Sequence, residues 1–241
     1  MLQKPKHAIG IVVLQLLVLQ FLVFFTADAD YIPPSRLTGF PYKNRSFDFD
    51  TILIEAFYDP LCPDSRDSWP PLKQALQHYG SRVSLVVHLL PLPYHDNAFV
   101  ASRALHIVNT LNTSATFPLL EWFFEHQEKF DNAQTLNSSR ASITDEIIKS
   151  ATEVVGSSYC NAVNDGFSDG KTDVQTRVSF KYATLRGVYG TPFFYVNGFL
   201  LPGSGAAIDY NTWMKVIDPL IAANKSIKEK GIPSLVKNAG L

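Results

Sequence analysis

The sequence predicts an α/β fold in which two parts of one mixed central sheet are separated by an inserted helical subdomain. A strand, a helix and a second strand follow one another within residues 47–94, a run of helices fills 95–187, and a hairpin with a final helix occupies 188–225. With 241 residues, 46% of them hydrophobic and 18% charged, the chain is long and apolar enough to bury a substantial core.

Composition excludes several classes of function. The chain carries 21 Lys and Arg against 22 Asp and Glu, a formal net charge of −1, so neither a nucleic acid nor an anionic membrane is expected as its main partner. Its 2 cysteines cannot form a disulfide framework or a four-thiolate zinc site. Because the 6 histidines are scattered, no metal site is predicted.

The first residues have the pattern of a secretory signal peptide, predicted over 1–29. Two lysines precede an apolar run over 9–25, and a small-residue A-x-A sequence follows at 27–29. The run is at the short limit for crossing a bilayer, so an uncleaved anchor is the alternative to cleavage. No later segment is apolar enough to span a membrane, and we expect no membrane contact beyond this segment.

Further features also indicate export. The chain ends without an ER-retention tetrapeptide, so the expected location is the secretory pathway: secreted, in the ER lumen or in a vacuole. Four asparagines stand in N-x-S/T sequences and are predicted glycosylation sites: Asn44, Asn112, Asn137 and Asn224.

The first half of the fold begins after a proline-rich, extended lead-in at 30–46. The nearly continuous apolar run 51–58 predicts a central strand, and apolar positions at helical spacing predict a helix from Asp64 to about Tyr79. Pro70 and Pro71 fall inside this helix and are expected to kink or split it. A second β-branched run, 83–90, completes a βαβ crossover with parallel strands.

The second half begins after the helical subdomain. The apolar run 193–196, the Asn-Gly turn at 197–198 and the apolar residues 199–201 predict a β-hairpin. An amphipathic helix is expected from Asp209, and a tail from 226 to 241. Within the helical subdomain, four helices are predicted: 97–111, 117–130, 142–156 and 171–187.

Two motifs carry the candidate chemistry. Residues 57–65 read F-Y-D-P-L-C-P-D-S at the predicted strand-to-helix turn, and residues 190–198 read G-T-P-F-F-Y-V-N-G at the start of the hairpin. Both motifs, in this order and with helices between them, resemble the DsbA-like branch of the thioredoxin superfamily. The resemblance covers about residues 47–225 and implies a thioredoxin-like fold, βαβ then ββα, with the helical insertion.

The resemblance assigns Cys62 as the nucleophilic sulfur. A cysteine at a helix N-terminus faces unpaired N–H groups and the positive end of the helix dipole, which favour its thiolate form. Pro63 suits the first helical turn, because its missing N–H would have no partner there. By resemblance, Thr191 and Pro192 form a cis peptide beside Cys62 that holds an extended client strand. Pro63 and Asp64 flank that client site.

Three departures from the family pattern indicate altered redox chemistry. Ser65 replaces the second cysteine, so no disulfide can form within the motif; it is included as a candidate catalytic residue, with a purely structural hydroxyl as the alternative. Asp64 places a carboxylate near the sulfur, which opposes the thiolate. Ala56 stands where many relatives carry a buried glutamate, and Glu55, one residue earlier, is expected on the opposite face of the strand.

These observations leave three hypotheses. In the first, the protein is a monothiol thiol–disulfide oxidoreductase or isomerase that forms mixed disulfides with protein or peptide clients through Cys62. It binds no cofactor, and glutathione is a candidate co-substrate that resolves the mixed disulfide. In the second, the fold is retained as a binding or chaperone-like module. In the third, it is a glutathione-binding transferase or isomerase. The sequence predicts no oligomeric state.

The remaining candidate residues have structural interpretations. Cys160 is expected to be a buried structural cysteine, with pairing to Cys62 or to another molecule as alternatives. His88 and His95 are expected to be structural rather than catalytic. Four aromatic residues are expected to form core between helices rather than a substrate groove: Trp122, Phe123, Phe124 and Phe130.

Overall fold

The computed structural model describes residues 38–44 and 51–229. The predicted signal peptide, the first part of the lead-in and the end of the predicted tail lie outside these residues. All of the elements described below belong to one compact unit of the chain, which begins at Thr38.

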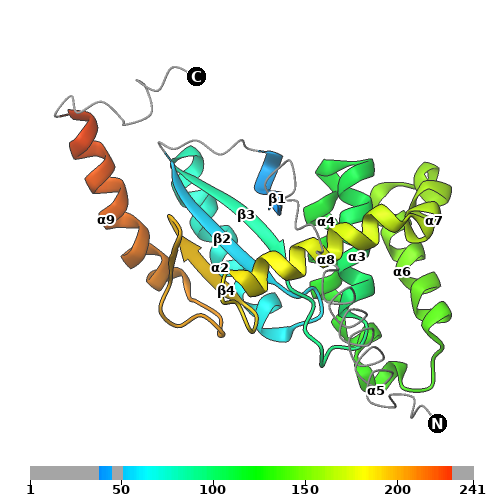
Figure 1. The fold of residues 1–241 in the computed structure, drawn as a ribbon. Helices are drawn as coiled ribbons and strands as arrows, with labels where there is room; N and C mark the ends of the chain where they lie inside the picture. The colour runs from blue at the N-terminus through cyan, green and yellow to red at the C-terminus, as the bar shows by residue number, and fades with distance from the viewer. Residues whose placement is uncertain (1–37, 45–50, 230–241) are drawn as a thin grey trace, which may run out of the picture. The chain divides into compact units, whose positions relative to one another are not determined.

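A mixed sheet forms the centre of the fold, as predicted (Figure 1). In the described part of the chain it has five strands in the order β1-β3-β2-β4-β5. β2 and β3 are parallel, whereas β1, β4 and β5 each run antiparallel to their neighbour. The strands are β1 (Phe40–Pro41), β2 (Ile52–Tyr58), β3 (Val83–Leu89), β4 (Phe193–Val196) and β5 (Phe199–Leu200).

The central strand, β2, is buried on both faces, as its apolar sequence predicts. Its side chains alternate between two cores. Ile54 and Ala56 pack in the larger core, which also contains side chains of the helices α2 (Pro63–Tyr79) and α9 (Tyr210–Glu229). Phe57 packs in a smaller core with Cys62 and with Ala183 of α8 (Gly170–Leu185).

The crossover helix, α2 (Pro63–Tyr79), differs from the prediction at its prolines. It runs as one helix through Pro70 and Pro71, although these residues lack two N–H donors, so of the two expected effects, a kink or a split, the split is wrong. Leu72, the next residue, and Ala75, one turn beyond Pro71, are fully buried in the larger core. This burial offsets the lost backbone hydrogen bonds.

The helical subdomain contains more helices than predicted. The expected helix 117–130 ends at Glu125 and continues as a short 3-10 helix, and α5 and α7 were not predicted at all. Gly166 in the middle of α7 lies against Ile107, where a Cβ atom would come within 2.6 Å of that side chain. The helices are α3 (Ala98–Leu111), α4 (Thr116–Glu125), α5 (Asn132–Thr135), α6 (Arg140–Val155), α7 (Cys160–Ser168) and α8 (Gly170–Leu185), with 3-10 helices at Tyr42–Asn44, Gly80–Arg82, Thr113–Ala115, Gln127–Phe130 and Ser157–Tyr159.

The last helix of the subdomain, α8, joins the helical subdomain to the sheet (Figure 1). It packs on α3 and α7 at one end and on β3 at the other. There the hydroxyl of Ser179 donates to the carbonyl of Leu89 and accepts from its N–H, at 3.0 and 3.1 Å. α8 therefore covers the sheet face opposite α2, although the sequence assigns it to the insertion.

The second half of the sheet is the predicted hairpin followed by α9 (Tyr210–Glu229). Asn197 and Gly198 both have positive φ, at 49° and 82°, the geometry that tight hairpin turns require. Trp213 and Ile217 of α9 are fully buried in the larger core. α9 continues past residue 226, where the sequence predicted the tail to begin.

The lead-in contributes an edge strand that the sequence did not predict. Phe40 of β1 lies opposite Val87 of β3. Gly39 makes this approach possible, because it has φ of 103° and a Cβ atom there would lie 2.6–2.7 Å from Val86 and the His88 ring. Only glycine tolerates both this positive φ and the close approach of the neighbouring side chains.

The four aromatic residues of the helical subdomain lie in or against its core. Phe123, Phe124 and Phe130 are buried, and the half-buried Trp122 packs against them. No helix in the described ranges has both the length and the apolar character needed to cross a bilayer.

Candidate functional site

The two sequence motifs meet at one end of the sheet. β2 ends at Tyr58, the chain turns, and Cys62 becomes the N-cap of α2. Its N–H donates to the carbonyl of Asp59 (3.1 Å) and its own carbonyl accepts from Arg66 (3.1 Å). These bonds place the thiol at the positive end of a 17-residue helix.

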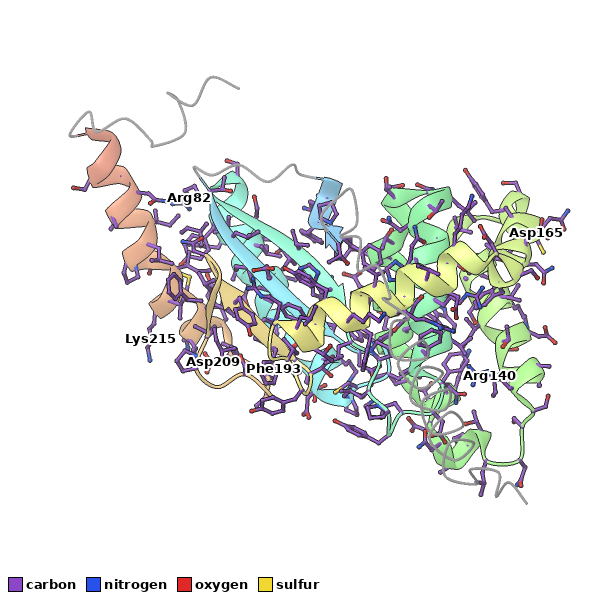
Figure 2. The ribbon with its side chains drawn as sticks, viewed as in Figure 1. Arg82, Arg140, Asp165, Phe193, Asp209 and Lys215 are labelled. Atoms are coloured by element: carbon purple, nitrogen blue, oxygen red, sulfur yellow. The ribbon has the colours of Figure 1, made fainter. Side chains whose placement is uncertain are left out.

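The second motif lies directly against this sulfur. The Thr191–Pro192 peptide is cis. The Cys62 thiol donates to the carbonyl oxygen of Thr191 with Sγ and O 3.4 Å apart, although 129 residues separate the two. Phe193, labelled in Figure 2, follows at the start of β4 and packs in the small core with Cys62. The structure therefore brings together the two segments that the sequence singled out.

Exposure differs sharply among the candidate site residues. Cys62 is only 4% exposed, and Thr191 is 5% exposed with a hydroxyl that has no hydrogen-bond partner among the described residues. Pro63 and Asp64, by contrast, lie on the surface beside them. The sulfur thus lies beneath a rim formed by the first residues of α2.

Ser65 points away from solvent and toward the end of β2. It is fully buried, and its hydroxyl accepts a hydrogen bond from the N–H of Asp59 (3.3 Å) while its carbonyl accepts from Ser68 (2.8 Å). These contacts support the structural interpretation of Ser65, because the hydroxyl is already used to fix the turn that carries Cys62.

Asp59 organises this turn, a role that the sequence reasoning missed. Its carboxylate is fully buried and accepts from the N–H groups of Leu61 (2.8 Å) and Leu92 (2.9 Å). The ring Nδ1 of His95 lies 2.8 Å from the same carboxylate. Asp59 therefore ties the Cys62 turn to the loop after β3. The signal available in the sequence was an acidic residue directly after a buried strand.

The contact with Asp59 changes the protonation of His95. The hydrogen bond to the carboxylate raises the pKa of His95 above its ordinary value, although partial burial opposes the shift. Next to it, Tyr94 is 61% exposed at the rim of the site. Partial burial, and then the electrostatic influence of the neighbouring Cys62, Asp59 and Asp64, raise the pKa of Tyr94.

Gln127 holds the Cys62 turn from the side of the helical subdomain and was also missed. Its side-chain amide donates to the carbonyls of Cys62 (2.8 Å) and Pro60 (3.1 Å). The residue is buried, and its amide oxygen has no partner in the described part of the chain. The inserted helices thus contribute directly to the position of the candidate nucleophile.

Glu55 lies on the face of β2 opposite Ala56, as predicted, but that face is the one that carries Cys62. It alternates with Ala56 as expected, but Phe57 on the Glu55 side packs with Cys62, whereas Ala56 belongs to the other core. Glu55 therefore occupies the face of the strand on which the sulfur lies. The reason is that the turn after Tyr58 brings Cys62 over that face.

A buried network surrounds Glu55. Its carboxylate accepts from Tyr182 (2.9 Å) and pairs with Arg186 (3.1 Å), and Nε2 of His88 lies 3.5 Å away. Burial acts to raise the pKa of Glu55, but these partners outweigh it and the pKa is lowered. Burial also lowers the pKa of His88. Neither ring nitrogen of His88 has a hydrogen-bond partner in the described part of the chain, so a structural role for His88, like that for His95, stays a prediction.

The prediction for Cys160 is wrong. Cys160 is exposed at the start of α7 rather than buried, and both cysteines are free thiols, so it does not pair with Cys62. Gly156 and the 3-10 helix Ser157–Tyr159 end the preceding helix and turn this segment outward. Pairing with another molecule is the alternative that stays open.

The predicted glycosylation sites are scattered over the surface elements. Asn112 is half-buried at the end of α3, and its side chain accepts hydrogen bonds from Ser114. Asn137 is exposed, and Asn224 is half-buried within α9. The side chain of Asn44 lies outside the described part of the chain. Glycosylation at each asparagine stays a prediction.

The side chains that could ligate a metal ion are spread apart in the described part of the chain. Within residues 38–44 and 51–229, no group of three or more His, Cys, Asp or Glu side chains could hold a metal ion. What the arrangement offers instead is one sulfur at a helix N-terminus beside a backbone carbonyl and a buried threonine hydroxyl. Such a sulfur can attack a disulfide and form a mixed disulfide.

Solved structures provide the comparison for this arrangement. A Pseudomonas syringae protein, provisionally assigned as a protein-disulfide isomerase, has a TM-score of 0.60 and 22% identity over 69% of this chain and 93% of its own. The thiol-disulfide exchange protein α-DsbA2 of Wolbachia pipientis has a TM-score of 0.57 and 21% identity over 76% and 88% of the two chains. The chain has a DsbA-like thioredoxin fold.

A third solved structure agrees with this assignment. The catalytic domain of ScsC from Proteus mirabilis has a TM-score of 0.53 and 20% identity, over 73% of this chain and 86% of that domain. No family model matches the sequence, and no curated protein does. The DsbA-like likeness is therefore one of fold, and the chemistry must be argued from the site.

Proposed function

We propose that this DsbA-like protein is a monothiol thiol–disulfide exchange protein of the secretory pathway that acts through Cys62. The single observation that carries the proposal is the 3.4 Å contact between the Cys62 sulfur and the carbonyl oxygen of Thr191, beside the cis Pro192. A thiol at a helix N-terminus supplies the nucleophile. The adjacent backbone edge supplies hydrogen bonds for an extended client strand.

The proposed reaction is an exchange between sulfurs. The Cys62 thiolate attacks one sulfur of a client disulfide, a new S–S bond forms, and the second client sulfur leaves as a thiolate that takes a proton from water. Because Ser65 cannot act as a thiol, a second thiol such as glutathione attacks the mixed disulfide. That step restores the Cys62 thiolate and leaves the client sulfur bound to glutathione.

Under this proposal, the residues around Cys62 have different roles. Thr191 and Pro192 contact the client backbone, whereas the exposed Pro63 and Asp64 contact its side chains at the rim. Ser65 supports the turn through its bond to Asp59. The clients are protein or peptide thiols and disulfides, and export is supported by the signal-peptide pattern and the four predicted glycosylation sites.

The test is the capture of a client. Incubated with a peptide that contains one disulfide, the protein is expected to form a mixed disulfide that is detected by intact mass and localised to Cys62 by peptide mapping. Cys62→Ser is expected to lose the adduct entirely. Cys160→Ser removes the exposed thiol and is the matched control that retains it. An adduct confined to Cys160 would refute the proposal.

A second candidate, a non-enzymatic client-binding module, is favoured by one observation. Cys62 is only 4% exposed, and its S–H is already donated to the Thr191 carbonyl, so little of the sulfur is accessible to a client disulfide. If the protein is such a module, wild type and Cys62→Ala bind cysteine-free unfolded peptides equally tightly, and Pro192→Ala binds them more weakly. Loss of peptide binding in Cys62→Ala would count against it.

A further inference from the structure

A pocket lies beside the candidate active site, sharing His95 and Leu92 with its surroundings, and the function proposed above does not use it. It is a pocket of ≈ 530 Å³ between the loop after β3, the first turn of α3 and the exposed side of α8. This volume falls in the range of small-molecule sites, about 300–1,000 Å³. Its lining residues are Pro91, Leu92, Pro93, His95, Asp96, Phe99, Arg177, Phe180 and Lys181.

Apolar side chains form most of this pocket. Phe99 of α3 and Phe180 of α8 both line it, and Phe180 is 39% exposed although it is aromatic. Leu92 is buried and closes the side toward the sheet. An aromatic or aliphatic body placed among these side chains would remove their apolar surface from water.

The charges in the pocket are unevenly distributed. Arg177 and Lys181 lie one helical turn apart on α8, so they share a face of the helix. Arg177 pairs with Asp173 at 2.7 Å, whereas the Lys181 ammonium has no ion pair or hydrogen bond within the described ranges. Asp96, in the loop after β3, also lines the pocket.

We propose that this pocket binds a small amphipathic organic anion, an apolar ring system or chain that ends in one carboxylate or sulfonate. The anionic group lies at the α8 wall, where Lys181 supplies an unpaired charge. The apolar body lies against Phe99 and Phe180. Asp96 repels an anionic group at the loop after β3 and so fixes which end of the ligand lies at Lys181.

Two related fluorescent probes separate charge recognition from apolar binding. Anilinonaphthalene sulfonate carries the anionic group, and N-phenylnaphthylamine has the same aromatic frame without it. The purified protein is expected to bind the sulfonate at one site. Lys181→Ala is expected to weaken that binding about tenfold, the size of one hydrogen bond to a charged group, and to change the binding of the neutral probe less than about twofold.

Four further variants make the test decisive. Asp96→Asn is expected to tighten sulfonate binding, and Phe99→Ala to weaken both probes. Lys149→Ala, at an exposed lysine of α6, is the charge control and is expected to change neither. The proposal is overturned if the sulfonate binds Lys181→Ala as tightly as wild type, or if Lys181→Ala weakens both probes equally. It is also overturned if Phe199→Ala, at an apolar residue exposed on β5, abolishes binding.

Discussion

Replacing Asp59 with alanine is expected to destabilise the protein by about 3–5 kcal/mol, as measured by chemical denaturation. The variant leaves the buried N–H groups of Leu61 and Leu92 without their acceptor and removes the partner of His95. Each buried donor that loses its only acceptor costs about 1–3 kcal/mol. The Cys62 turn and the loop after β3 would both lose their common anchor.

The controls separate this effect from a general loss of charge. Asp67→Ala removes an exposed carboxylate from the same helix region and is expected to change stability by less than about 1 kcal/mol. Asp59→Asn is expected to be destabilised as well. The N–H groups of Leu61 and Leu92 donate to different oxygens of the carboxylate, whereas an asparagine side chain has only one oxygen that can accept. An alanine variant as stable as Asp67→Ala would contradict the assigned role of Asp59.

The same pair makes part of the stability dependent on pH. The bond to Asp59 raises the pKa of His95 in the folded state, so its contribution is fully present below the unfolded pKa of about 6.5. The contribution is lost as the pH rises through the raised folded pKa. The stability difference between wild type and His95→Asn is therefore expected to shrink on going from acidic to alkaline pH.

Ser65→Cys is expected to convert the monothiol site into a dithiol site. Cys62 and residue 65 lie three positions apart at the start of α2, with Cα atoms about 5 Å apart, within the range that a disulfide spans. The introduced thiol would attack a mixed disulfide at Cys62 and release the bound thiol. The introduced thiol acts at an effective concentration of millimolar or more. The amount of Cys62–glutathione mixed disulfide that forms on incubation with oxidised glutathione is therefore expected to fall at least about tenfold.

Quantification by intact mass, together with thiol counting by alkylation, measures this change. In Ser65→Cys, the two sulfurs of the motif are expected to become resistant to alkylation as glutathione is released. Ser65→Ala removes the hydroxyl without adding a thiol and is expected to accumulate adduct as wild type does. If the glutathione adduct persists in Ser65→Cys while the introduced thiol can still be alkylated, the two sulfurs do not meet, and the assigned geometry of the motif is contradicted.

The fold could be predicted because its strands and helices are strongly patterned. The apolar run of β2 and the Asn-Gly turn of the hairpin determine local structure by themselves. Pro70 and Pro71 misled the prediction, because the burial of the next turn of α2 outweighs the missing backbone bonds. β1 was missed for a related reason: Gly39 permits a tertiary approach to His88 that leaves no periodic signal.

The site could be predicted only where it depends on motifs. The sequence singled out Cys62 and Thr191, and the structure brings them together. Asp59 and Gln127 were missed because their roles come from contacts across 33 and 65 residues, which no local pattern encodes. Cys160 was misplaced because burial was inferred from residue type alone, although its neighbours form a turn at the surface.

The most direct test compares the two thiols of the native protein in a single reaction. Both are alkylated with iodoacetamide at neutral pH without denaturant, and the modification of each is followed by peptide mapping. If Cys62 is activated at the N-terminus of α2, it reacts faster than the exposed Cys160 although it is only 4% exposed. Rapid modification of Cys160, with Cys62 protected until the protein unfolds, would contradict a reactive sulfur at this site.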